Sequence, residues 1–409
     1  MITQAAAEPL LALKTRTTPA EFAAALRARG PIFRAEVEGF RVVTAHDLAL
    51  TVLKDDAFSA DRSAFFEGNA RAAGCPFHRV ASFFGVVKKM MVNSDGAAHA
   101  KRRKLAAFGL ADSVVDEFSP AVERAVAALL DRAAGKAELD FVADLALPLP
   151  NTVLADLFAV PQGARADFYR WANDMTQFFG GGSGDPHAAA ARADEGAARL
   201  GAYLQELVSR RRDGDAGDFI SRLVRAQGAL GLDDSEVVSQ AAMMLVAGTV
   251  TTTDQMANDL AVLLAEPGLL ELLRARPALL PAAIEEATRL DPSVNFVFRC
   301  ARMDTALGDA RVKAGELVFV STHAANRDPR VFERPDELRL DRTGSPHLSY
   351  GAGAHYCLGA RLGRIQLVAL LSALLSRATR VRPAAVRPAV RKHQSLGFSG
   401  FETLPLALS

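Results

Sequence analysis

The sequence predicts one large, mostly α-helical domain with small β-sheets toward its two ends. From about residue 95 to residue 289, Ala, Leu and Val recur at three- and four-residue spacing, which is the period of amphipathic helices. Short runs rich in Val, Ile and Phe, which favour strands, lie before and after this region. Because no linker composition and no internal repeat separates these parts, we expect a single domain over residues 1–409.

The composition of the chain restricts its function class. Half of the 409 residues are hydrophobic and 23% are charged, which excludes wholesale disorder. A net charge of +1 argues against a dedicated nucleic-acid binder. Three cysteines are too few for a disulfide framework. The apolar runs are shorter than the roughly 20 residues that cross a bilayer, and the N-terminal stretch lacks the basic region of a secretion signal. We therefore expect a cytoplasmic protein with no membrane anchor.

The sequence of the first part of the chain predicts a helix followed by a β-hairpin. The helix is expected over residues 19–29. The two strands of the hairpin are expected at residues 32–37 and 40–43, with Glu38 and Gly39 in the turn.

Helices fill the centre, and the last third is mixed. Turn signals interrupt the helical pattern at residues 161–163 and 180–184. A long helix is expected to begin near Asp233, where Asp233 and Glu236 have the spacing of a capping box. The elements expected after the helical centre are a strand at 317–320, loops up to residue 359, a helix over 360–378 and a short β-rich tail.

The strongest chemical signal surrounds Cys357. Three glycines, Gly351, Gly353 and Gly359, lie within nine residues around it, and an apolar helix follows. Glycine permits positive φ and lets the backbone approach a flat ligand. A cysteine at a helix N-terminus has its thiolate favoured by the helix dipole. These features suit a single axial thiolate on a haem iron.

Cys357 has three other possible interpretations. A small buried cysteine in a tight turn is the commonest structural explanation for such a residue. Zinc would require further ligands, and no second cysteine lies nearby. A Cys–His nucleophile with His355 lacks an obvious third group to orient the histidine.

The segment from Tyr350 to Gly359 resembles the haem-binding loop of cytochromes P450, whose pattern is Phe-Gly-x-Gly-x-His-x-Cys-x-Gly. Tyr350 stands where the family usually has Phe. The resemblance implies the P450 fold, a triangular helical prism with haem b between helix I and helix L. It also implies that Cys357 ligates the iron and that Tyr350, Gly351 and Gly359 contact the cofactor.

Further motifs occur in the order that this family has them. Glu286 and Arg289 are similar to the Glu-x-x-Arg of helix K, a structural pair that ties this helix to the loop before the cysteine. Their i, i+3 spacing puts both charges on one helical face.

The remaining matches concern the haem carboxylates. His99 and Arg103 resemble the His-x-x-x-Arg of helix C, and Arg299 matches a further basic position. His347 and His355 match the other propionate contacts. Two propionates favour several charge-assisted bonds from Arg and His. Any one of these matches alone would be an ordinary solvated side chain.

The expected long helix contains a segment similar to the oxygen-binding part of helix I. The resemblance implies that Gly248 leaves room for O₂, and that Thr251, beside Thr252, manages proton delivery. Val250 occupies the position of the usual acid and cannot relay a proton. A threonine–water chain, polar groups of the substrate, or chemistry with a smaller proton demand could each account for this. Alternatively, these threonines bond only to helix carbonyls.

By resemblance, four segments should line the substrate pocket, and many of their residues are aromatic. A bulky apolar or aromatic substrate is therefore expected, although these rings could equally be core. The candidate residues are Phe83, Phe84, Phe178, Phe179, Val294, Phe296 and Leu396, with Phe65, Phe66 and Phe77 in the first segment and a glycine-rich lid at 180–184.

The leading functional hypothesis is an O₂-dependent monooxygenase that hydroxylates or epoxidises a small molecule of specialised metabolism. Only about fifty residues follow Cys357, so no fused reductase is expected. Electrons would come from NAD(P)H through a separate ferredoxin or flavodoxin and its reductase. Residues that could form a basic docking face are Lys101, Arg102, Lys104, Arg361 and Arg364. The alternatives are oxidative coupling, suggested by Val250, and a haem-binding protein without catalysis.

Overall fold

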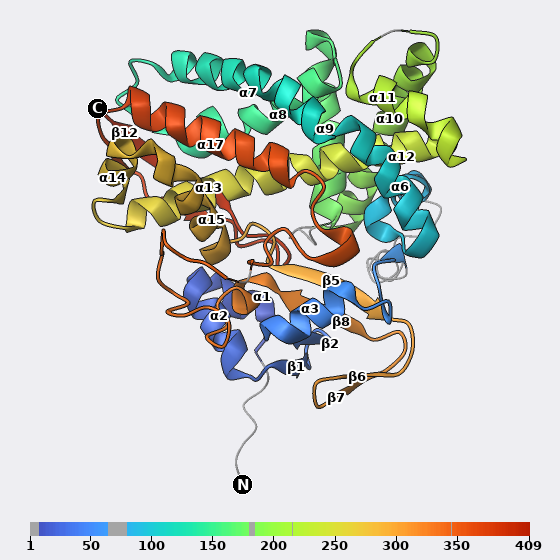
Figure 1. Cartoon of the computed structure of the whole chain (residues 1–409), viewed down its shortest axis with the longest axis horizontal. Helices are drawn as coiled ribbons and strands as arrows, with labels where there is room; N and C mark the ends of the chain where they lie inside the picture. Colours follow the sequence, from blue (N-terminus) through green and yellow to red (C-terminus); the bar gives the residue numbers. More distant parts are fainter. Residues whose placement is uncertain (1–7, 64–79, 180–184, 215, 345) are drawn as a thin grey trace. The chain divides into compact units, whose positions relative to one another are not determined.

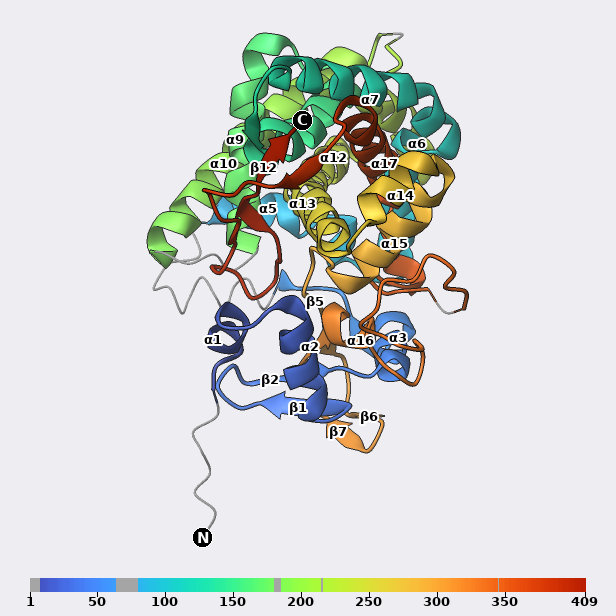
Figure 2. The same ribbon diagram turned by 90° about the vertical axis from the view of Figure 1, so that its left-hand side faces the viewer.

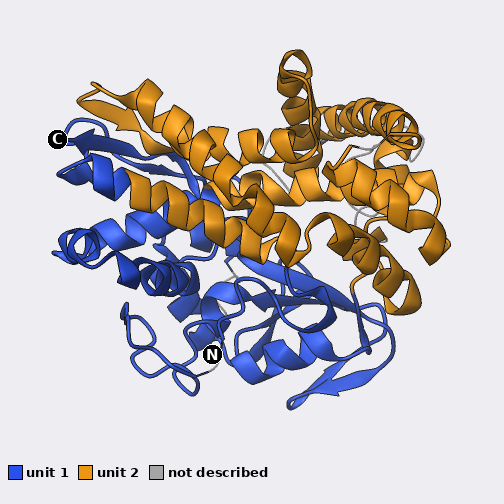
Figure 3. Cartoon of the chain, turned by 45° about the horizontal axis from the view of Figure 1, so that its top comes forward, with its two compact units in different colours: residues 1–59, 254–357, 374–409 blue, residues 60–253, 358–373 orange. Residues whose placement is uncertain are grey.

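The computed structural model describes residues 8–63, 80–179, 185–214, 216–344 and 346–409. The described chain is mostly helical with small sheets, so the predicted fold class is confirmed. Contacts divide it into two compact units, each built from separate stretches of chain (Figure 3). Unit 1 comprises residues 1–59, 254–357 and 374–409, and unit 2 comprises residues 60–253 and 358–373. The expectation of a single domain stays a prediction.

Unit 1 contains a five-stranded sheet. Its strands, in spatial order, are β1 (Ile32–Ala35), β2 (Phe40–Val43), β8 (Leu317–Ser321), β5 (Phe296–Ala301) and β3 (Phe58–Ser59). The predicted hairpin is present as antiparallel β1 and β2, although its first strand ends at Ala35. Successive residues of β8 face opposite sides, because side chains alternate along a strand. Val318 and Val320 pack into one hydrophobic cluster, and Phe319 packs into the other.

Helices and small ribbons complete unit 1. The helix α2 starts with a capping box of Thr18 and Glu21, and it packs against α16 (Figure 2). The helices are α1 (Leu10–Thr15), α2 (Pro19–Ala28), α3 (His46–Lys54), α14 (Leu269–Ala275), η5 (Pro277–Leu279), α15 (Leu280–Leu290), α16 (Thr322–Ala325) and η6 (Gly353–His355). The remaining strands are β6 (Thr305–Leu307), β7 (Ala310–Val312), β9 (Val381–Pro383), β10 (Val390–Arg391), β11 (Phe401–Thr403) and β12 (Pro405–Leu408).

Unit 2 is almost entirely helical. Its helices α9, α10 and α12 pack against one another (Figures 1 and 2). The helices are α5 (Ala81–Val87), η2 (Met91–Asn93), α6 (Gly96–Gly109), α7 (Asp112–Ala133), η3 (Phe141–Ala146), α8 (Pro148–Leu157), η4 (Gln162–Ala164), α9 (Arg165–Phe179), α10 (Pro186–Arg211), α11 (Phe219–Leu230) and α12 (Asp234–Gly248). One short strand, β4 (Glu138–Asp140), interrupts the region predicted to be helical.

The long helix predicted to begin near Asp233 is divided into two helices. Its capping box of Asp233 and Glu236 is present, but α12 ends at Gly248 and α13 (Val250–Ala265) begins after Thr249. The hydroxyls of Thr249 and Thr251 each donate to a carbonyl one turn back. Such side-chain bonds compete with the helix ladder and bend it.

Two helices continue from unit 2 into unit 1. They are α13, whose first four residues belong to unit 2, and α17 (Ala360–Arg377), whose residues up to Ala373 do. None of the described helices combines the length and the apolar composition that crossing a membrane requires.

Candidate functional site

Cys357 lies at the end of a tightly folded loop, three residues before α17 begins. The Cys357 N–H donates to the carbonyl of Tyr350 at 2.9 Å, and this bond closes the loop. The Tyr356 N–H donates to the Gly353 carbonyl at 3.1 Å. The cysteine is exposed, and these main-chain bonds fix the backbone from which its sulfur projects.

Gly353 shows why this loop requires glycine. Its φ of +70° lies in the left-handed region that other residues avoid. A Cβ at this position would lie 3.0 Å from Cγ of Lys54 and 3.1 Å from the carbonyl oxygen of Leu53. The loop and the end of α3 therefore approach each other more closely than a side chain would allow.

Asn326 anchors the loop from the side, a role that the sequence did not reveal. Its Oδ1 accepts from the N–H of Leu348 at 2.6 Å, and its Nδ2 donates to Ser349 Oγ at 2.9 Å. The same Nδ2 donates to the carbonyl of Arg289 at 3.1 Å. The loop thus shares one buried amide with the end of α15.

Glu286 and Arg289 form a bidentate ion pair on α15, with N–O distances of 2.8 and 2.9 Å. Arg289 also donates to the carbonyls of Asn326 and Pro335, which lie in the segment before the cysteine loop. Burial alone would raise the pKa of Glu286, but bonds from Arg289 and Arg342 lower it below its ordinary value. The pair therefore joins α15 to the loop as charged groups.

The proposed propionate contacts are divided between the units. In unit 2, His99 and Arg103 lie one turn apart on α6, and His99 is buried. In unit 1, Arg299 is buried on β5, and His355 ends the short helix η6. His347 Nε2 lies 3.2 Å from a carboxylate oxygen of Glu285. This local partner was not expected for a residue predicted to contact a propionate.

The junction of α12 and α13 is shaped by Gly248. A Cβ there would lie 3.2 Å from Cδ1 of Leu154 on α8. Thr251 donates its hydroxyl to the carbonyl of Ala247, as expected if the threonines bond to helix carbonyls. Thr252 is half-buried beside it, and Val250, at the position of the usual acid, is buried.

Asp254 is a second residue to which the sequence assigned no role. It is buried on α13, and Lys392 Nζ donates to its Oδ1 at 2.7 Å. Burial raises the pKa of Asp254 to about 6, although the Lys392 ammonium opposes this shift. Its carboxylate is oriented toward the tail of the chain, where a Cβ at Gly400 would lie 2.3 Å from its Oδ1.

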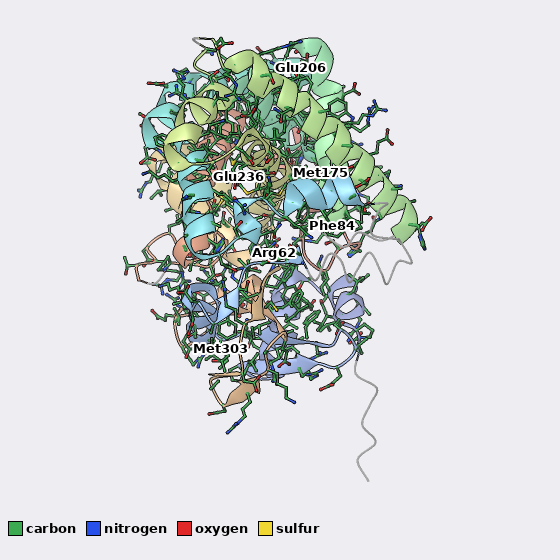
Figure 4. All side chains as sticks on the ribbon, turned by 90° about the vertical axis from the view of Figure 1, so that its right-hand side faces the viewer. Arg62, Phe84, Met175, Glu206, Glu236 and Met303 are labelled. Carbon is green, nitrogen blue, oxygen red and sulfur yellow. The ribbon has the colours of Figure 1, made fainter. Side chains whose placement is uncertain are left out.

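Four of the predicted pocket residues gather in unit 2. The ring of Phe83 lies 5.7 Å from Phe84, 5.0 Å from Phe178 and 5.2 Å from Phe179. Phe83 and Phe84 are buried, as is Met175 on α9 (Figure 4 labels Phe84 and Met175). The rings therefore form one aromatic cluster. Phe65, Phe66, Phe77 and the glycine-rich segment 180–184 lie outside the described residues.

The other three predicted pocket residues meet in unit 1. Val294 forms an isolated bridge with Phe398. Asn295 Nδ2 donates to the carbonyl of Leu396 at 2.8 Å, which fastens the tail beside β5. Phe296 and Leu396 both pack into the hydrophobic cluster around Phe22.

Comparison with known proteins shows the family of the chain that carries this loop. A family model described as cytochrome P450 matches residues 9–379. The chain is a member of the cytochrome P450 family. It is 38% identical over 363 residues to the nocardicin C N-oxygenase of Nocardia uniformis subsp. tsuyamanensis, covering 87% of this chain and 86% of that protein. The predicted membership of the P450 family is thereby confirmed, and the chain is a P450 monooxygenase.

Solved P450 structures share the fold. The crystal structure of CalO2 matches with a TM-score of 0.88 and 28% identity, covering 98% of each chain. The P450 described as CxnD, for C–S bond formation in chuangxinmycin biosynthesis, matches with a TM-score of 0.82 and 28% identity. That match covers 96% of this chain and 94% of CxnD.

The residues of this P450 fit the haem iron that the family uses. Cys357 offers one exposed sulfur at the start of a helix, where the thiolate is favoured. The glycines of its loop carry no side chains, so at these positions a flat ligand can approach the backbone closely. Basic side chains suited to carboxylates stand in both units, with His99 and Arg103 in one and Arg299 and His355 in the other.

Proposed function

We propose that this P450 uses O₂ to hydroxylate or epoxidise a bulky apolar or aromatic small molecule in specialised metabolism. The Cys357 loop carries the proposal, because its sulfur is fixed by the bond to Tyr350 and by the positive φ of Gly353. The relative named nocardicin C N-oxygenase supports oxygen transfer in a biosynthetic setting. The cofactor is haem b, and NAD(P)H supplies electrons through a separate ferredoxin or flavodoxin and its reductase.

The protein residues have distinct tasks in this proposal. The haem, when bound, supplies an iron that activates O₂. Cys357 ligates this iron, and His99, Arg103, Arg299 and His355 orient the cofactor through its carboxylates. Asn326 and Arg289 hold the cysteine loop rigid, because each bonds to main-chain atoms before it.

Thr251 positions protons. Its hydroxyl hydrogen is used by the Ala247 carbonyl, so its oxygen lone pairs stay available to accept from a water. A water held in this way would place a proton donor near Gly248, where the resemblance to the family leaves room for O₂. Val250 cannot ionise, so the water chain has to be supplied by solvent or by the substrate.

Aromatic and aliphatic side chains select the substrate. The Phe83 cluster in unit 2 and the segment of Val294, Phe296 and Leu396 in unit 1 offer apolar contact surface. Large rings supply apolar contact area at a small entropic cost, which favours a bulky apolar ligand.

The first test compares two cysteines. Cys357→Ser should abolish the spectrum of a thiolate-ligated ferrous CO complex, because an alcohol does not replace the thiolate. Cys300→Ser is the matched control and should leave the spectrum unchanged, since Cys300 lies on β5. An unaltered spectrum in Cys357→Ser would remove the proposed ligand.

A second candidate reaction is oxidative coupling of the substrate, favoured by the buried, non-ionisable Val250. The likeness to CxnD, the P450 described for C–S bond formation, supports this candidate. Val250→Glu should then shift products from coupled toward hydroxylated species, because the glutamate restores a proton donor. Val250→Gln has the same shape without an ionisable group and should not cause this shift. Product ratios measured by mass spectrometry decide, and equal ratios in both variants would reject a role for the missing acid.

A further inference from the structure

A small cavity in unit 1 is lined by basic side chains, and none of the described residues that line it is acidic. Its lining consists of Lys14, Thr17, Thr18, Pro19, Phe22, Asn295, His323, Arg391, Lys392, His393 and Ser399. Its volume is about 20 Å³, on a scale where one water molecule needs roughly 10–15 Å³. The cavity therefore has room for a small ion. None of these residues belongs to the proposed haem site.

Two of the cations already have carboxylate partners behind the cavity. Lys392 Nζ donates to Asp254 Oδ1 at 2.7 Å, and Arg391 Nη2 donates to Asp291 Oδ2 at 2.6 Å. Burial alone would raise the pKa of Asp291, but Arg391 and His323 lower it to about 2. These carboxylates are therefore committed to their partners.

Lys14 is the cation that has no direct ion pair among the described residues. Its ammonium donates to the carbonyl oxygens of Ser395 and Phe398, and no described carboxylate lies within ion-pair distance of it. Its exposed fraction is only 8%. Burial lowers the pKa of Lys14 to about 8, so it remains mostly charged at neutral pH. Asp254 and Asp291 stabilise this charge only from beyond ion-pair distance, and an anion in the cavity would pair with it directly.

Two buried nitrogen atoms in the lining have no hydrogen-bond partner among the described residues. His323 is 1% exposed, and its Nε2 lies 3.2 Å from Asp291 Oδ1. Burial lowers the pKa of His323, so the ring is neutral, with its proton on Nε2 facing the carboxylate. Its Nδ1 is then an acceptor, and it has no partner among the described residues. Arg391 Nη1, a donor, is likewise buried without a partner.

We propose that this cavity binds a small oxyanion that carries a hydroxyl group, with hydrogen phosphate as its model. The anion oxygens accept from Lys14 and Arg391, and the hydroxyl donates to Nδ1 of His323. Lys392 and the exposed His393 add positive charge beside it. A lone water could satisfy the same atoms, but it would leave Lys14 without a direct ion pair. The proposal does not rest on the function proposed above.

The experiment measures thermal unfolding of the full-length holoprotein at pH 7. Sodium phosphate is titrated against sodium chloride at equal ionic strength, and sodium sulfate is the third arm. Phosphate should raise Tm and saturate, because a bound ligand stabilises the folded state by mass action. Sulfate should act at least tenfold more weakly, since it carries no proton for His323 at this pH. Glycerol 3-phosphate distinguishes a phosphate ester from the free ion, and tighter binding of either one identifies the source.

Lys14→Met tests the site itself. It removes the charge and keeps an unbranched apolar side chain, so phosphate affinity should fall at least tenfold. Lys313→Met, at an exposed lysine of unit 1, is the matched control and should keep full affinity. As a readout independent of the variant's folding, phosphate should shift the ¹⁵N signal of His323 Nδ1 in the wild-type protein.

Any one of four results would overturn the proposal. A phosphate response no greater than that of chloride would mean that water alone fills the cavity. Equal responses to phosphate and sulfate would remove the acceptor role of His323. Unchanged phosphate affinity in Lys14→Met, or a His323 signal that ignores phosphate, would place the anion elsewhere.

Discussion

Arg289 links several separate segments of unit 1 through one side chain. It is 1% exposed, and its guanidinium donates to the Glu286 carboxylate and to the carbonyls of Asn326, Pro335 and Glu337. Only the planar fork of arginine supplies this many directed donors from one group. The i, i+3 spacing on a helix is local information, so the sequence indicated that the two charges share one face. The loop that the pair reaches was implied by the resemblance to the P450 family.

At the same scale, the buried Asp254 leads to a prediction about how stability depends on pH. Its folded-state pKa of about 6 exceeds its ordinary value of 3.8. A raised carboxyl pKa makes ionisation costly in the fold, so its contribution to stability declines as pH rises from about 4 to above 6. Asp254→Asn removes this decline. We expect the free energy of unfolding of wild type minus variant to fall by up to about 3 kcal/mol across this window, at roughly 1.4 kcal/mol per pKa unit.

Chemical denaturation at pH 4, 5, 6 and 7 measures this difference. The exposed Asp309 on the β6–β7 ribbon provides the control Asp309→Asn, whose difference from wild type should not depend on pH in this way. Parallel profiles for wild type and Asp254→Asn would contradict the assignment.

At the scale of elements, a glycine in the cysteine loop should be essential for stability, whereas a glycine in the following helix α17 should be replaceable. Gly353→Ala should lower the free energy of unfolding by roughly 1–3 kcal/mol, because its positive φ is unfavourable for alanine. The added Cβ would also press on the main chain of Leu53. Gly363→Ala, inside α17, is the control. Its Cβ would meet nothing within 4 Å, so a gain of about 0.5–1 kcal/mol is expected.

Thermal unfolding and haem retention measured together test this difference between loop and helix. If Gly353→Ala were as stable as Gly363→Ala, the close approach of the loop to α3 would not be required for the fold.

The division of the long helix at Thr249 illustrates what the sequence could not predict at this scale. Its apolar period continues through the break, and its capping box correctly marked the start. The interruption depends on threonine hydroxyls bonding to carbonyls one turn back, and each threonine could equally have pointed to solvent.

At the scale of the whole molecule, the predictable and unpredictable parts differ in how local they are. The hairpin of β1 and β2 and the Cys357 motif depend on near neighbours, and both were found from the sequence. The parallel pairing of β2 with β8 joins Arg41 to Val318, and no local pattern specifies such a distant partner. The cavity beside Lys14 likewise required residues from four separate segments to meet.

Docking of an electron donor also concerns the surface of the whole protein. Two of the candidate basic residues have local acidic partners, since Arg102 pairs with Glu236 and Arg361 with Asp112 and Asp116. Lys101 and Lys104 on α6 are exposed. Replacing both with Glu should slow reduction by an acidic ferredoxin about tenfold at low salt, because the complementary charge is reversed.

Stopped-flow reduction at increasing ionic strength measures this effect, which should shrink as salt screens the charges. Arg132→Glu, at an exposed position on α7, should change the rate much less. A rate in the double variant that equals the wild-type rate at low salt would argue against docking on α6.

The division of unit 1 among three stretches of chain has a consequence for biosynthesis. Residues 60–253 leave the ribosome as one continuous piece, whereas β2 must wait for β8, and Asp291 must wait for Arg391. The loop that carries Cys357 lies in the part that closes last. We therefore expect the nascent chain to bind haem only after residues 374–409 have left the ribosome.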